Sequence, residues 1–277
     1  MADHRTGCIA TSGDIRLTEM VHFSFALSPR MRAFIELRDG LNCLEAACVN
    51  QHGANWLHAA CDLRASLLGD QGRKGAISEL IALFGDLKSY LNKLCDDAPQ
   101  YREKIQQSCD QVDMLIAQIQ SGLPEACDYL AKDALVNAYL NAQKKHDWLG
   151  HKLCMQQSIK AIWSKSDART LPLHQALAPL SSAVDTLDQM LNDFVGWKKC
   201  IANGGTGHIT PERGKSFGLL VIALPADAVA EGIIPDISGN RLAIRLRFQR
   251  WSAGQAPADY NEDIPYAMML VPIGFAT

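Results

Sequence analysis

Three arginines alternate with apolar residues in the segment RLAIRLRFQR, which spans residues 241–250. Neighbouring side chains of a β-strand point to opposite faces, so the sequence predicts Arg241, Arg245 and Arg247 on one face. The residues opposite them are apolar and are predicted to face a core. A guanidinium group binds a carboxylate or a phosphate through two parallel hydrogen bonds. This segment therefore predicts an anion-binding surface on the outer face of a strand.

Other interpretations of these arginines remain open at this point. A charged outer face also protects a strand from pairing with another chain, although lysine would serve that purpose equally well. A nucleic-acid-binding module, or a binder of some other anionic peptide, would use the same cations. Binding of single-stranded nucleic acid favours aromatic side chains among the cations, and this face offers only Trp251. The net charge of −3 also argues against a general polyanion binder.

Several sequence motifs of common enzyme classes are absent from the chain. It contains no G-x-G-x-x-G, G-x-x-x-x-G-K-[ST] or H-E-x-x-H motif. The Gly-rich segment 202–208 lacks the lysine of a phosphate-binding loop and is predicted to be a flexible connection. The eight histidines are dispersed, and the nine cysteines include no C-x-x-C pair, which predicts buried free thiols. We expect a protein that is not an enzyme and that needs no metal or cofactor.

The composition is typical of a globular protein, with 48% hydrophobic and 21% charged residues among 277. A chain of this length can form two modest domains, each with its own core. The N-terminus, MADHRTGCIATSGDIRL, lacks the apolar segment of a secretory signal. The sequence contains no stretch of about 18 apolar residues, so no membrane span is predicted. The sequence therefore predicts a cytoplasmic location.

The first half of the chain has the periodicity of helices. Residues 1–20 are polar and are predicted to form a flexible leader, and an alternating run at 22–27 is compatible with a brief edge strand. Ser28 and Pro29 suit the N-cap and the first position of a helix. Amphipathic periodicity predicts one helix from Pro29, others over about 54–68, 74–95 and 99–120 ending at Gly122, and a fifth from Pro124. We expect an α-helical bundle over 21–150 that carries the dimer contacts.

After residue 150 the periodicity changes. The segment KLCMQQSIKAIWSK, 152–165, alternates as a strand with one buried face, and a long helix is predicted at 173–200. Further strands are predicted at 215–226, 241–251 and 263–275, with turn residues between them. Sequential strands with short links favour antiparallel pairing. The predicted fold is α+β: an N-terminal helical bundle and a four-stranded antiparallel β domain, 151–277, covered by the long helix.

Short segments at both ends of the chain carry a family resemblance. The segment SGNRLAIR, 238–245, resembles the S-G-x…R-x-A-I-R strand of the ZapD family of FtsZ-associated cell-division proteins, with a slightly shorter turn. The start of the first helix is similar to that family's P-L-x-x-x-M-R-x-[WF]-[LI] segment. The matching residues there are Phe25, Leu27, Ser28, Met31, Arg32, Phe34 and Ile35. The family's spacing around the connection of the second and third helices recurs in Leu67, Leu68, Arg73, Glu79 and Leu80. The order of elements agrees over about residues 21–275.

The resemblance implies a symmetric homodimer that binds the C-terminal tail of FtsZ, a tubulin-like protein, and bundles FtsZ filaments at the mid-cell division ring. In the family, the tail binds a positively charged pocket on the β domain. Carried over residue by residue, that pocket contains Arg241, Arg245 and Arg73. Alternation along the strand adds Arg247 to these residues.

Two positions depart from the family pattern. The family has a basic residue near Ala134 and a histidine near Ala161. Lys160, on the polar face of the predicted strand 152–165, is the candidate to supply the missing charge. The leader of about 20 residues has no counterpart in the resemblance.

Overall fold

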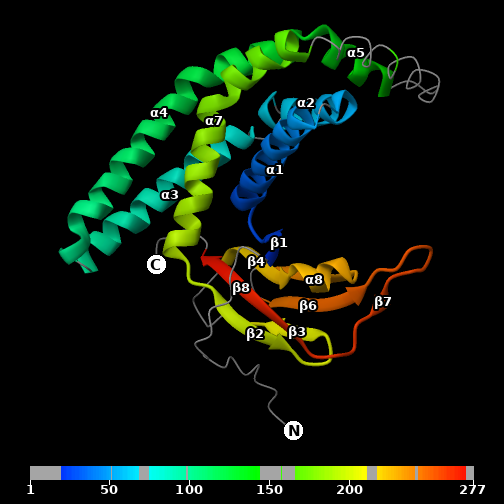
Figure 1. Cartoon of the computed structure of the whole chain (residues 1–277). Coiled ribbons are helices and arrows are strands. Elements are labelled where there is room, and N and C mark those ends of the chain that lie inside the picture. Colours follow the sequence, from blue (N-terminus) through cyan, green and yellow to red (C-terminus); the bar gives the residue numbers. More distant parts are fainter. Residues whose placement is uncertain are drawn as a thin grey trace. The chain divides into compact units, whose positions relative to one another are not determined.

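The computed structural model describes residues 20–50, 52–68, 75–97, 99–143, 157, 166–210, 217–240 and 243–272 (Figure 1). Helices and antiparallel strands occupy different stretches of the chain, which confirms the predicted α+β class. The helices are α1 (Pro29–Val49), α2 (Gly53–Leu68), α3 (Ala76–Asp97), η2 (Pro99–Tyr101), α4 (Arg102–Lys132), α5 (Ala134–Gln143), α7 (Ser166–Phe194) and α8 (Ala226–Ala230). The strands are β1 (Met20–Ala26), β2 (Lys198–Ala202), β3 (Thr206–Ile209), β4 (Phe217–Pro225), β5 (Ile233–Asn240), β6 (Ala243–Arg250), β7 (Ala258–Asp259) and β8 (Ile264–Pro272).

The described chain divides into two compact units. Residues up to Arg32 and from Met190 onward form the β unit, and Ala33–Gln189 form the helical unit. Strand β1 belongs to the β unit because it pairs antiparallel with β4 along its whole length. In the sequence-based prediction, this strand is instead grouped with the helices that follow it. Its pairing partner, β4, lies far along the chain and cannot be recognised from local periodicity. The expected boundary near residue 150 lies outside the described residues.

The helical unit is built on amphipathic helices whose apolar stripes meet. Helices α3 and α4 pack side by side (Figure 1), and α2 packs against α4 and α5. The buried stripes of the first pair are Leu80, Phe84, Leu87 and Leu91 of α3 and Ile105, Cys109, Val112, Leu115 and Ile119 of α4. Burying one leucine of such a stripe stabilises the fold by about 1.5–3 kcal/mol. Helix α1 begins as predicted, since Ser28 Oγ accepts a hydrogen bond of 3.3 Å from Met31 N.

Helix α4 differs from its prediction. The sequence predicts an end at Gly122 and a new helix from Pro124, but α4 continues through both to Lys132. A proline inside a helix costs about 3 kcal/mol because a hydrogen bond is lost. Buried Ile119, Ala126 and Leu130 continue one apolar stripe across the proline, and their packing outweighs that cost. The fifth helix is therefore the shorter α5.

The long helix also differs in its bounds. It is predicted at 173–200, whereas α7 begins at Ser166 and ends at Phe194. Cys200, taken as the end of the helix, lies in β2, where Cys200 and Ala202 are buried on one face. The apolar stripe of α7 ends at Phe194, and the alternating residues of β2 begin soon after, at Lys198. The short interval explains why the helix is predicted to extend too far. Up to Gln189, α7 belongs to the helical unit.

The β unit contains two antiparallel sheets, where the sequence suggests one. Sheet A has the strand order β1-β4-β8-β2, and sheet B has the order β3-β6-β5, with β7 pairing the end of β6. Strands β2, β3, β5 and β7 are not among the predicted strands. β2, β3 and β7 have only five, four and two residues, and β5 lies in the link expected between the strands at 215–226 and 241–251. A single apolar core draws on both sheets. Its members include Leu220, Ile222, Leu224, Tyr266 and Met268 from sheet A and Ile233, Ile244, Leu246 and Phe248 from sheet B.

The structure tests the prediction on membrane spans, but it describes almost none of the predicted strand 152–165. Among the described residues, no helix is long and apolar enough to cross a membrane. The predicted strand lies almost wholly outside the described residues, as does the predicted leader up to residue 19.

Candidate anion-binding face

Strand β6 alternates as the sequence predicts. Ile244, Leu246 and Phe248 are buried in the core, whereas Arg245 is exposed and Arg247 is half-buried on the opposite side. We call this opposite side, together with the residues paired beside it on β3, β5 and β7, the outer face of sheet B. The prediction that Arg245 and Arg247 share an outer face is confirmed.

Arg245 is surrounded by neutral or weakly basic neighbours. It lies between His208 of β3 and Ser238 of β5 in the sheet register, and both of these residues are exposed. No carboxylate among the described residues forms an ion pair with its guanidinium group. Its charge is therefore available to a partner on this part of the face.

Arg247 has a different environment on the same strand. Its Nε lies 3.4 Å from Asp259 Oδ1 of β7 and 3.9 Å from Asp236 Oδ2 of β5. Asp236 is its register partner, and β7 brings Asp259 to the other side. These are ion-pair distances without hydrogen-bond geometry, since the Nε is buried and makes no hydrogen bond to the described residues. The charge of Arg247 is thus balanced within the chain, so Arg245 and Arg247 are not equivalent cations.

A tight turn before β3 holds β6 in place. Gly204 and Gly205 both have positive φ, 55° and 68°, and Thr206 N donates to Asn203 O at 3.2 Å. This combination is typical of a two-residue hairpin turn. Gly205 O accepts a hydrogen bond of 2.8 Å from Phe248 N, and a Cβ on Gly205 would lie 1.6 Å from Tyr260 O. The Gly-rich segment is therefore an ordered turn and not the flexible connection that the sequence predicts.

The other predicted site residues, Arg73, Lys160 and Arg241, all lie outside the described residues, as does Ala161. Ala134 begins α5, and Asp133 caps that helix by accepting hydrogen bonds of 2.9 and 2.8 Å from the backbone of Leu135 and Val136. A carboxylate thus stands beside the position where the family has a basic residue.

A cysteine and a histidine lie together in the helical unit. Cys48 Sγ of α1 is 3.0 Å from His174 Nε2 of α7, beside a hollow of about 470 Å³ that Glu45 and Asp185 help to line. Burial raises the pKa of the Cys48 thiol, and burial lowers the pKa of the His174 imidazole. Both groups are held neutral, whereas an activated cysteine needs a thiolate beside a histidine cation. The contact therefore lacks the electrostatics of a nucleophilic pair.

The remaining thiols match a structural role. None of the described cysteines forms a disulfide, and Cys61, Cys109 and Cys200 are buried as predicted, although Cys43 is exposed. Burial raises the pKa of Cys61 to about 12. In the described part of the chain, no group of three or more His, Cys, Asp or Glu residues could hold a metal ion.

Comparison with known proteins gives a partial match. No protein-family model matches the chain. The chain is 31% identical over 96 residues to Cell division protein ZapD of Ralstonia nicotianae. The match covers 35% of this chain and 37% of that protein's length. It supports a ZapD-like relationship over about a third of each chain.

Proposed function

We propose that this chain is a cell-division factor that binds the C-terminal tail of FtsZ and, as a dimer, cross-links FtsZ filaments. The partial identity to a protein named Cell division protein ZapD supports a role in division. The observation that carries the binding proposal is the exposed Arg245 on the outer face of sheet B, which has no carboxylate partner among the described residues. In this proposal the protein acts in the cytoplasm, at the mid-cell division ring.

The chemistry of the site is recognition of a carboxylate by a guanidinium group. A planar guanidinium group donates two parallel hydrogen bonds to one carboxylate. An exposed ion pair of this kind contributes only about 0.2–1 kcal/mol, so a single tail would be held weakly. Arg241, Arg73 and Lys160 are the further cations that we propose for this site. No catalytic step, metal or cofactor enters this mechanism.

Cross-linking requires two sites on one particle. A two-fold dimer presents two copies of the same face, and we propose that the helical unit provides the dimer contacts. A filament displays many tails, so contacts that are weak individually add up by avidity. Each dimer would then join two filaments side by side and compact the division ring.

Co-sedimentation with polymerised FtsZ tests the proposal. We expect the protein to pellet with full-length filaments at low salt, to pellet less at moderate salt, and to remain in solution with filaments that lack the tail. The salt effect is expected because exposed charges are screened within about 8 Å at physiological ionic strength. Equal pelleting with tailless filaments would refute tail binding, and pelleting without an increase in light scattering would refute bundling.

A further inference from the structure

The outer face of sheet B has an exposed tryptophan at the end opposite Arg245. Trp251 follows β6 directly, and its position continues the alternation of Arg245, Arg247 and Gln249. The residue is 57% exposed, and its Nε1 donates to Gln249 Oε1 at 3.4 Å. Trp251 lies six residue steps beyond Arg245 along the extended strand, which corresponds to roughly 20 Å. The face therefore offers a cation at one end and a large apolar surface at the other.

The backbone of Trp251 is fixed by the fold. Its N donates a hydrogen bond of 2.8 Å to Gly232 O, which extends the pairing of β5 and β6 by one step. Gly232 has a φ of 84°, and a Cβ at this position would lie 2.3 Å from Trp251 O. A glycine is thus needed for the close approach that positions the tryptophan. An exposed side chain that is already positioned loses little entropy when a partner packs on it.

The charges between the two ends indicate the class of partner. Arg247 lies between Asp236 and Asp259, so the middle of the face carries more acidic than basic groups. A polyphosphate chain that ran from Arg245 to Trp251 would pass over these two carboxylates and be repelled. A peptide with one carboxylate at the Arg245 end and neutral or basic residues beyond it would not be repelled. The charge pattern therefore favours an extended peptide over a nucleic acid.

We infer that Trp251 is the apolar anchor of this face, and that the bound tail segment carries a carboxylate and an apolar side chain roughly 20 Å apart. This inference rests on the proposed function and specifies which tail residues the face recognises. Tryptophan and arginine are the residues that most often dominate binding energy at interfaces. The arginine supplies a salt-dependent contact, and the tryptophan supplies a contact that salt does not screen.

The test is the affinity of a fluorescently labelled FtsZ C-terminal tail peptide, measured by anisotropy at several salt concentrations. Trp251→Ala should raise the Kd about tenfold at every salt concentration, and Trp251→Phe should retain most of the affinity. Arg245→Glu should raise the Kd and flatten its salt dependence. Tyr101→Ala, which removes another exposed aromatic side chain but in the helical unit, is the matched control and should bind as the wild type does.

Two further measurements separate the possible failures. In a peptide whose apolar residues are replaced by serine, Trp251→Ala should have no additional effect, because the two changes remove the same contact. If Arg245→Glu weakens binding and Trp251→Ala does not, the anchor is refuted while the proposed function stands. If the wild type binds no tail peptide, the proposed function and the anchor both fail. Tighter binding of a labelled single-stranded oligonucleotide than of the peptide would overturn the choice of a peptide partner.

Discussion

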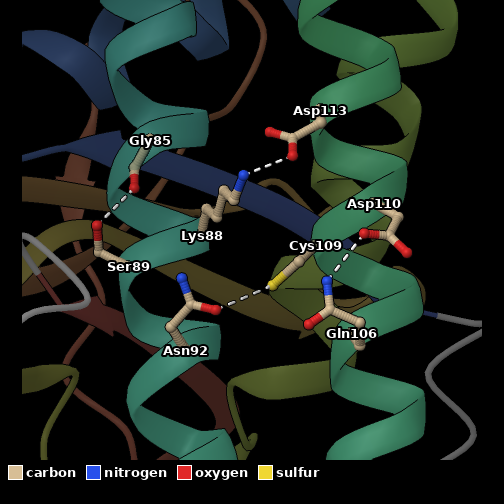
Figure 2. A network of polar contacts seen from close by, with 8 residues as sticks. All are labelled: Gly85, Lys88, Ser89, Asn92, Gln106, Cys109, Asp110 and Asp113. Carbon is tan, nitrogen blue, oxygen red and sulfur yellow. Dashed lines mark hydrogen bonds and ion pairs between the residues drawn. The ribbon is translucent and has the colours of Figure 1, made fainter.

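The seam between α3 and α4 and the outer face of sheet B use charged side chains in opposite ways. Along the seam, Lys88 of α3 donates to Asp113 of α4, and Cys109 of α4 donates to Asn92 of α3 at 3.7 Å (Figure 2). The hydrogen bond to Asp113 raises the pKa of Lys88. On the outer face of sheet B, Arg245 has no carboxylate partner among the described residues. Polar groups at the seam are therefore satisfied by the fold itself, whereas Arg245 is the cation that we propose for a partner.

The same contrast exists within β6, between Arg245 and Arg247. Two carboxylates, one from β5 and one from β7, balance Arg247. Arg247 therefore resembles the charges of the helical seam, although it shares a face with Arg245. Position on the outer face is not sufficient to identify a binding residue, and the local partners decide which arginine is available.

The largest expected effect separates the two faces of β6. Ile244→Glu buries a charge without a partner and should destabilise the β unit by about 4 kcal/mol or more. Arg245→Glu, one residue along, should change stability by about 0.5 kcal/mol or less because the side chain is exposed. Urea unfolding followed by circular dichroism measures both. Comparable losses in the two variants would contradict the assignment of Arg245 to the outer face.

The next effect concerns the turn that holds β6. Gly205→Ala should cost about 3 kcal/mol, because positive φ is strained for alanine and its Cβ would overlap Tyr260 O. Gly204→Ala meets only Asn261 O at 3.7 Å, so it should cost about 1–2 kcal/mol for positive φ alone. Thermal unfolding of the pair gives the difference. Equal costs would show that the approach to Tyr260 does not constrain the turn.

A smaller effect is expected at the helical seam. Lys88→Ala should reduce stability by about 0.5 kcal/mol, because the Lys88 and Asp113 side chains are 36% and 54% exposed. The double variant with Asp113→Ala should add little to this loss. Binding of the FtsZ tail should be unchanged in both variants. A binding defect would mean that the seam is not purely structural.

The smallest effect is a pH dependence of the helical unit. Burial lowers the pKa of His174 below its usual 6.5, so the unfolded chain binds the proton more readily. The contribution of His174 to stability is therefore present above about pH 6.5 and is lost as the pH falls through the lowered value. Stability of His174→Asn should depend less on pH than that of the wild type. Parallel pH profiles for the two proteins would show that His174 does not contribute.

The orientation of β6 can be predicted from sequence, because the alternation of arginines with Ile244, Leu246 and Phe248 is a local rule. The partners of Arg247 are harder to predict. Asp236 follows from the register of the β5–β6 hairpin, which depends on the exact turn near Asn240. Asp259 lies in a strand of two residues that has no sequence pattern at all. Sequence therefore identifies the face but not the balance of charge on it.

The fold shows the same limit. Amphipathic stripes locate the helices, but at Pro124 tertiary packing overrides a local signal that normally ends a helix. The apolar residues of α7 are followed within a few positions by the alternating residues of β2, so the end of α7 cannot be read from either pattern alone. The pairing of β1 with β4 joins residues about 200 positions apart, and no local rule specifies such a contact.

The most direct test of the central claim is co-sedimentation of two charge-reversal variants with full-length FtsZ filaments at low salt. Arg245→Glu changes the outer face of sheet B, and Lys198→Glu changes an exposed residue of sheet A. We predict that Lys198→Glu pellets with the filaments as the wild type does, and that Arg245→Glu remains in solution while keeping the wild-type melting temperature. Pelleting of Arg245→Glu at the wild-type level would contradict the claim that this face binds the FtsZ tail.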